Sequence, residues 1–157
     1  GTTQDLFSPN APMTRGMLVT VLYRLAGSPK SAAGSGFADV AAGKYYADAV
    51  AWAAESGIVS GVSDGRFAPD SQVTREQLAA ILYRYARDKR YDTGKTADLT
   101  GFADYEQISG YAAEALSWAN AEGLVSGRSK TALSPQGQAT RAEVAAILHR
   151  FAENVAK

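Results

Sequence analysis

The chain has 157 residues, with 16 Lys and Arg against 16 Asp and Glu, one His and no Cys. This length suits one compact domain with a buried core, or a short array of repeats. The balanced charge excludes the strongly basic surface expected of a nucleic-acid binder or a polybasic membrane anchor. No apolar run approaches the roughly 20 residues that a membrane span requires, so we expect no insertion into a membrane.

The sequence contains three related copies, and a recurrence at this period is typical of stacked repeat units. Each copy includes a loop with a proline, a Thr-Arg pair and an amphipathic segment. The second and third copies also have an upstream half, which the first lacks, so we expect the chain to begin inside a repeat. We divide the chain into copies at 1–27, 37–87 and 101–157, joined by linkers at 28–36 and 88–100.

The first copy predicts one amphipathic helix, beginning at Thr14. Met17 lies where a capping box would need Glu or Gln. This helix has no alanine-rich partner in its own copy, so its apolar face needs another cover. We expect self-association through this helix, or its coverage by a linker such as 27–36. The residues predicted on the face are Leu18, Val21, Leu22 and Leu25.

The second copy predicts two helices joined by a loop. An alanine-rich helix over 45–56 ends at Gly57, a residue suited to the left-handed conformation after a helix C-terminus. Phe67 is expected to anchor the loop on the core. Thr74 and Gln77 fit a capping box at the start of the second helix. The residues predicted on its buried face are Leu78, Ile81, Leu82 and Tyr85.

The third copy predicts the same arrangement. Its alanine-rich helix covers 111–122 and ends at Gly123, Leu133 replaces the loop phenylalanine, and Thr140 with Glu143 fits a second capping box. The residues predicted on the buried face of its last helix are Val144, Ile147, Leu148 and Phe151.

An arginine follows the capping threonine in every copy: Arg15, Arg75 and Arg141. A cation there opposes the partial positive charge of the helix N-terminus, at a cost on the order of 0.3–1 kcal/mol. One interpretation is an anionic ligand bound by the guanidinium together with the first-turn amides. The other is a structural ion pair with a carboxylate of a neighbouring copy, such as Asp39 or Asp104.

The remaining candidates are weaker. Trp52 and Trp118 occupy matching places in the alanine-rich helices, as core aromatics or as a platform on which a sugar stacks. His149 aligns with tyrosines and is expected to fill a packing position. Late helical arginines such as Arg150 are expected to be structural, because a cation complements a helix C-terminus. We identify no catalytic residue, no metal ligand and no cofactor.

The order of the motifs closely resembles the S-layer homology (SLH) repeat. The second copy carries Phe-Ala-Asp, Gly-Ile-Val-Ser-Gly and Asp-Gly-Arg-Phe-Ala-Pro, and the third has Thr-Arg-Ala-Glu, the form most typical of the family. The resemblance implies an all-α fold of helix-loop-helix repeats in a pseudo-threefold spindle. It also implies grooves that bind secondary cell-wall polymers, often with pyruvate ketals, in which the motif arginine is a groove residue.

We therefore expect an extracellular, cell-wall or S-layer associated module that anchors an exported protein non-covalently to cell-wall polysaccharide. The expected glycan-binding residues are Arg15, Arg75, Arg141, Asp39, Asp104, Trp52 and Trp118. The alternative is a structural or protein-binding helical repeat that mediates assembly at the cell surface. An enzyme is not expected, because glycoside hydrolysis uses two carboxylates flanking the bond and no such pair is evident.

Overall fold

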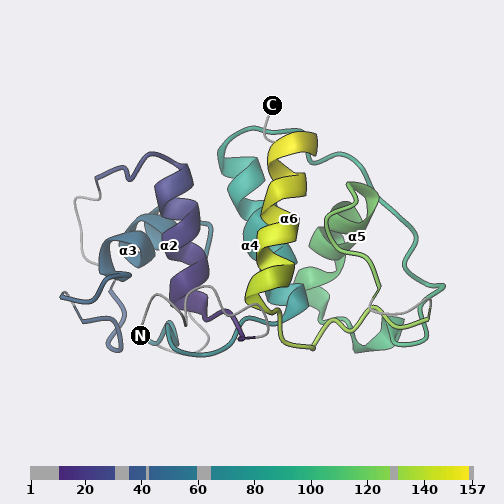
Figure 1. Ribbon diagram of the computed structural model, residues 1–157, viewed down its shortest axis with the longest axis horizontal. Coiled ribbons are helices and arrows are strands. Elements are labelled where there is room, and N and C mark those ends of the chain that lie inside the picture. The colour runs from purple at the N-terminus through teal and green to yellow at the C-terminus, as the bar shows by residue number, and fades with distance from the viewer. Residues whose placement is uncertain (1–10, 31–35, 42, 60–64, 128–130, 156–157) are drawn as a thin grey trace. The chain divides into compact units, whose positions relative to one another are not determined.

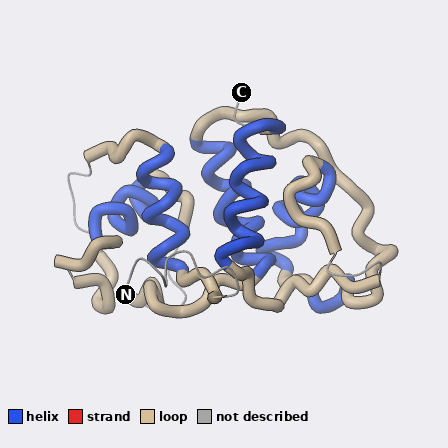
Figure 2. Tube along the Cα trace, viewed as in Figure 1, coloured by secondary structure: helices blue, strands red, loops and turns tan. Residues whose placement is uncertain are grey.

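The described residues of the computed structural model form helices and no strand, which confirms the all-α class (Figures 1 and 2). Within them, extended backbone pairs only at isolated bridges, such as Thr14 with Gln72 and Thr74 with Gln138. The structure describes residues 11–30, 36–41, 43–59, 65–127 and 131–155.

The chain divides into two compact units that cut across the sequence copies. The α2–α3 unit is Met13–Val73, and the α4–α6 unit is Thr74–Lys157 together with Gly1–Pro12. The sequence copy is therefore not the packing unit: the last helix of one copy packs with the first helix of the next. The helices are α2 (Arg15–Leu25), α3 (Ala47–Glu55), α4 (Arg75–Asp88), α5 (Ala113–Ala121) and α6 (Arg141–Asn154), with short 3-10 turns η1 (Tyr105–Gln107) and η2 (Gly110–Ala112).

In the α2–α3 unit, α3 supplies the cover that α2 lacks within its own copy. Leu18 and Leu22 of α2 are fully buried, as predicted. Val19 is buried instead of Val21, which is half-buried. The prediction for Leu25 was wrong: it is 59% exposed, because it is the last residue of α2 and the chain turns away at Gly27, whose φ is 89°. Self-association through α2 remains a prediction.

In the α4–α6 unit, α4 packs against α5 and contacts α6 through an aromatic pair. Its predicted buried residues are all in the core, whereas on α6 Leu148 is only half-buried. The ring centroids of Tyr85 on α4 and Phe151 on α6 are 5.9 Å apart. Tyr83 packs on Trp118 of α5 at 5.4 Å. The core therefore gathers aromatic side chains from three helices.

The predicted caps and glycine ends are confirmed, whereas α3 and α5 begin at Ala47 and Ala113, two residues later than predicted. Both capping boxes are complete, because the side-chain oxygens of Gln77 and Glu143 each accept a hydrogen bond from the backbone N–H of the capping threonine. Thr14 still accepts from the Met17 N–H at 3.1 Å, without the return bond. Gly57 and Gly123 have φ values of 75° and 74°, the left-handed region that ends α3 and α5.

Candidate functional site: a groove beside Arg75

The helices that begin with Thr-Arg are fastened to the loop of another copy through their first backbone amides. The N–H of Gly16 donates to the carbonyl of Pro69 at 2.8 Å, and that of Glu76 donates to Pro135 at 2.9 Å. In α2 and α4 these donors are therefore already used within the protein, which leaves the guanidinium as the group that could bind an anion there. The backbone N–H groups of the three arginines follow one pattern, each donating to a carbonyl of another copy. That of Arg15 donates to Ser71 at 2.8 Å, that of Arg75 to Gly137 at 2.8 Å and that of Arg141 to Ala11 at 2.9 Å.

The Arg75 side chain lies inward, with 5% of the residue exposed. Its Nε donates to the Leu133 carbonyl at 3.1 Å, Nη2 donates to the Ser126 carbonyl, and Nη1 donates to Glu143 Oε2 at 2.6 Å. These acceptors offset the cost of a cation in the first helical turn. A carboxylate of the next copy does balance the arginine: Glu143 forms the ion pair, and the charge of Arg75 also helps to lower the pKa of Asp104, the residue suggested by the sequence.

Arg15 has a related environment in the α2–α3 unit. Its Nε donates to the Phe67 carbonyl at 2.9 Å, and its guanidinium lies 4.6 Å from the centre of the Phe67 ring. This residue is also buried, at 6% exposure. Arg141 is half-buried at the start of α6. Arg15 and Arg75, the two buried arginines of the first helical turns, therefore each help to hold a loop in place.

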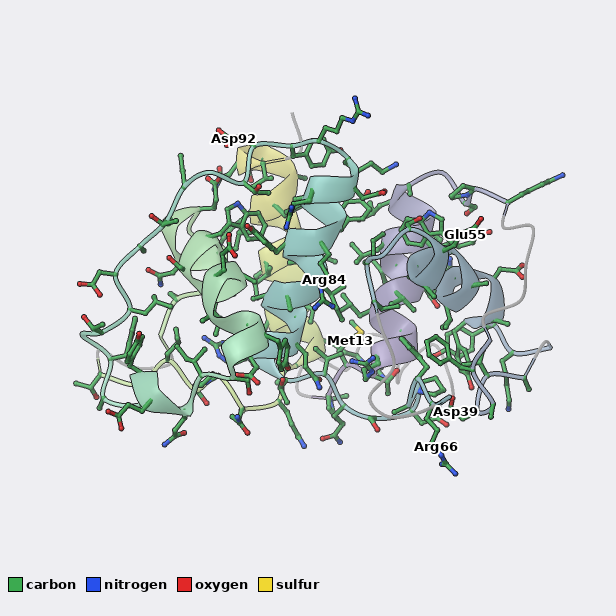
Figure 3. The ribbon with its side chains drawn as sticks, turned by 180° about the vertical axis from the view of Figure 1, so that it is seen from behind. Met13, Asp39, Glu55, Arg66, Arg84 and Asp92 are labelled. Carbon is green, nitrogen blue, oxygen red and sulfur yellow. The ribbon has the colours of Figure 1, made fainter. Side chains whose placement is uncertain are left out.

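Asp39 and Asp104 each clasp the turn that precedes the loop proline. The oxygens of Asp39 accept from the N–H of Phe67 at 2.9 Å and of Ala68 at 2.8 Å. Ala68 has a φ of 60°, so the carboxylate stabilises a left-handed turn. The Phe67 hydrogen bond is the main cause that lowers the pKa of Asp39, with a small contribution from Arg66, which extends outward nearby (Figure 3).

Asp104 repeats this clasp in the α4–α6 unit. Its oxygens accept from the N–H of Leu133 at 2.9 Å and of Ser134 at 2.8 Å. The Leu133 hydrogen bond is the main cause that lowers the pKa of Asp104, and the charge of Arg75 adds to it. Both aspartates thus hold the loops that in turn hold the arginines.

The two tryptophans lie in the core. Trp118 is fully buried and Trp52 is 7% exposed. Trp52 packs on Tyr23 with ring centroids 5.6 Å apart, the counterpart of the Tyr83–Trp118 pair. A sugar stacks only on an accessible ring face, so this burial favours the alternative in which both residues are core aromatics.

A groove of about 210 Å³ opens beside Arg75, within the α4–α6 unit. One wall is residues 124–127, which belong to the Gly-Leu-Val-Ser-Gly motif of the third copy, and the other is a face of α6. Arg150 lies on that face, exposed, with Nη1 at 3.4 Å from the Leu124 carbonyl. The lining residues are Arg75, Leu124, Val125, Ser126, Gly127, Glu143, Ala146, Ile147 and Arg150.

The lining of the groove carries more positive than negative side chains. Two guanidiniums and one carboxylate line it, leaving an excess of positive charge, and Ser126 is a further polar residue in its lining. Glu143 is the one carboxylate among these lining residues, so they do not offer the pair used in glycoside hydrolysis. Sequence reasoning missed that Arg150 and Glu143 line the groove, although the recurrence of Gly-(Ile/Leu)-Val-Ser-Gly in the second and third copies was a usable signal.

Comparison with known protein families decides the identity of the fold. The model of the S-layer homology domain matches residues 36–79 and 101–145, more than half of the chain. The chain belongs to the SLH domain family. The matched stretches include Arg75 and residues 124–127 of the groove lining, whereas Arg150 lies beyond them.

The relatives of this SLH chain include enzymes and surface-layer proteins. It is 32% identical over 98% of its length to an amylopullulanase of Thermoanaerobacterium thermosulfurigenes, and 30% identical over 98% to exoglucanase XynX of Acetivibrio thermocellus. It is 37% identical over 76% of its length to the surface-layer 125 kDa protein of Lysinibacillus sphaericus. The chain spans only 8%, 14% and 10% of these relatives, respectively.

Membership of the SLH family implies cell-wall anchoring, and the surface-layer relative is consistent with an extracellular, cell-wall associated location. The enzymes share with this chain only a small part of their length, so the similarity does not indicate catalytic activity. In the described ranges of the chain, no helix has both the length and the apolar character needed to cross a membrane.

Proposed function

We propose that this SLH chain anchors a larger exported protein to the bacterial cell wall by binding an acidic secondary cell-wall polysaccharide in the groove beside Arg75. The observation that carries this proposal is the groove itself, in which two arginines and residues 124–127 of the Gly-Leu-Val-Ser-Gly motif converge within one unit. A carboxylated sugar, such as one with a pyruvate ketal, matches both the positive charge and the polar wall.

Within this proposal, Arg75 and Arg150 have different tasks. Arg75 is 5% exposed and bonded to two backbone carbonyls, so it forms the floor of the groove. Arg150 is exposed on α6 and meets a ligand directly. Arg15 and Arg141 are the equivalents of Arg75 in the other copies, and we propose them for corresponding sites.

The test is co-sedimentation with purified cell-wall sacculi, before and after chemical removal of the attached polysaccharide. Wild-type protein is expected to sediment only with sacculi that retain the polymer. Arg150→Glu should weaken this binding by about tenfold or more, because it reverses the accessible charge in the groove. Arg90→Glu is the matched control, since Arg90 is exposed in the same unit and does not line the groove.

Two results would contradict the proposal. Equal binding to stripped sacculi would exclude the attached polysaccharide as the ligand and point to the peptidoglycan that remains. Equal weakening by Arg150→Glu and Arg90→Glu would mean that overall charge, rather than the groove, determines wall binding.

A further inference from the structure

We propose that the Glu143 carboxylate is an intramolecular occupant of the anion subsite in this groove, and that a carboxylate of the ligand replaces it on Arg75. The inference rests on the proposed function and concerns how that site discriminates among ligands. Its basis is the 2.6 Å ion pair between Arg75 Nη1 and Glu143 Oε2, which lies in the groove lining.

The two members of this ion pair differ in accessibility. The Glu143 side chain is 27% exposed, whereas that of Arg75 is 6% exposed. A ligand entering from solvent therefore meets the carboxylate first. The carbonyls of Leu133 and Ser126 hold Arg75 independently of this pair, so the guanidinium has bonds that keep it in place when Glu143 moves.

Glu143 divides its two oxygens between two tasks. Oε1 accepts from the Thr140 backbone N–H at 3.2 Å and completes the capping box of α6, while Oε2 accepts from Arg75. The capping task does not require a carboxylate. In the second copy Gln77 performs it with one amide oxygen, which accepts from the Thr74 N–H at 3.0 Å.

The role of Gln77 indicates which substitution of Glu143 would separate helix capping from pairing with Arg75. A glutamine at position 143 would keep the cap through its single oxygen and would remove the Glu143 carboxylate from Arg75. The substitution also removes one negative charge from a groove lined by two arginines. It therefore frees the guanidinium for a ligand and preserves the start of α6.

The ion pair also determines selectivity. A ligand carboxylate can exchange with Glu143 because it restores a charge-assisted hydrogen bond to Arg75. A neutral sugar that displaced Glu143 would leave a buried guanidinium without its counter-ion. Glu143 thus lowers the affinity of the groove for acidic glycans and excludes neutral ones from direct contact with Arg75.

The experiment is titration calorimetry of the full chain with a methyl hexoside bearing a cyclic pyruvate ketal, and with the methyl ester of the same compound. Glu143→Gln should bind the acid about tenfold more tightly than wild type, because the ligand gains one charge-assisted hydrogen bond to Arg75 without competition from Glu143. The affinity of this variant for the ester should differ little from that of wild type. Glu153→Gln is the control: it removes the same charge from α6 at a side chain that is 61% exposed and does not line the groove. Thermal unfolding of each variant verifies that α6 is intact.

Each result bears on the proposal. A gain for the acid with Glu143→Gln, absent from Glu153→Gln, supports it. Measurable wild-type binding of the acid that Glu143→Gln leaves equal or weakens would overturn it and leave the proposed function standing. An equal gain for acid and ester would also overturn it, because the variant would then have opened the groove without exchange of carboxylates. No binding of the acid by any variant would overturn both proposals.

Discussion

Removal of the Arg75 guanidinium should destabilise the protein, although the residue belongs to a ligand groove. In Arg75→Met the apolar stem of the side chain is largely kept, and the bonds to Leu133, Ser126 and Glu143 are lost. Each charge-assisted bond contributes about 1.5–3 kcal/mol when the partner stays buried. Because Glu143 is 27% exposed and regains water, its share falls well below that range.

The two carbonyls dominate the remaining cost, so we expect the free energy of unfolding to fall by about 3 kcal/mol, near the lower end for breaking a buried charge pair. Urea unfolding monitored by helical circular dichroism measures this directly. Arg150→Met is the control and should change stability by less than about 0.5 kcal/mol, since Arg150 is exposed. A loss below about 1 kcal/mol for Arg75→Met would refute the reasoning, because the guanidinium would then not hold the loop of the third copy.

Two further predictions concern the core and the loop clasps. Leu82→Ala should lower the free energy of unfolding by roughly 2–5 kcal/mol because Leu82 is fully buried. Leu148→Ala should lower it by less than half as much because Leu148 is half-buried. Urea unfolding that ranks the two variants in the opposite order would contradict the assigned helix faces. Hydrogen bonds lower the pKa of Asp39 and of Asp104 below the ordinary 3.8. Both carboxylates therefore stabilise the fold above that pH, and this stabilisation disappears as the pH falls through their pKa values in the folded state. The double variant to Asn should therefore be less stable than wild type at pH 7, and the difference should narrow below about pH 4; a gap independent of pH would show that the clasps do not titrate with folding.

The variation between copies illustrates what tertiary contacts decide. Gly16 follows Arg15 in the first copy, where a Cβ would lie 3.0 Å from both the Tyr46 ring and the Pro69 carbonyl oxygen. Glu76 follows Arg75 in the second copy, and its carboxylate accepts from the Ser109 N–H at 3.0 Å and hydroxyl at 2.6 Å. Each residue is suited to its own partner, and nothing in either motif alone names that partner.

The sequence by itself determined the features that depend on neighbouring residues. Periodicity of apolar residues located the amphipathic helices, and Thr74 with Gln77 located a cap, because helical spacing and capping bonds span only a few positions. Gly57 marked the end of α3 for the same reason. The repeated motifs also sufficed to indicate the SLH family.

Only the tertiary structure decided how these elements are combined. It paired the last helix of one copy with the first helix of the next, and so covered α2 with α3. It selected Glu143 rather than Asp104 as the ion-pair partner of Arg75, and placed Arg150 in the groove and Trp118 in the core. These pairings depend on contacts between residues far apart in the chain. The repeat pattern would be the same whichever distant carboxylate or helix face contacted a given residue, so the sequence does not determine the partner.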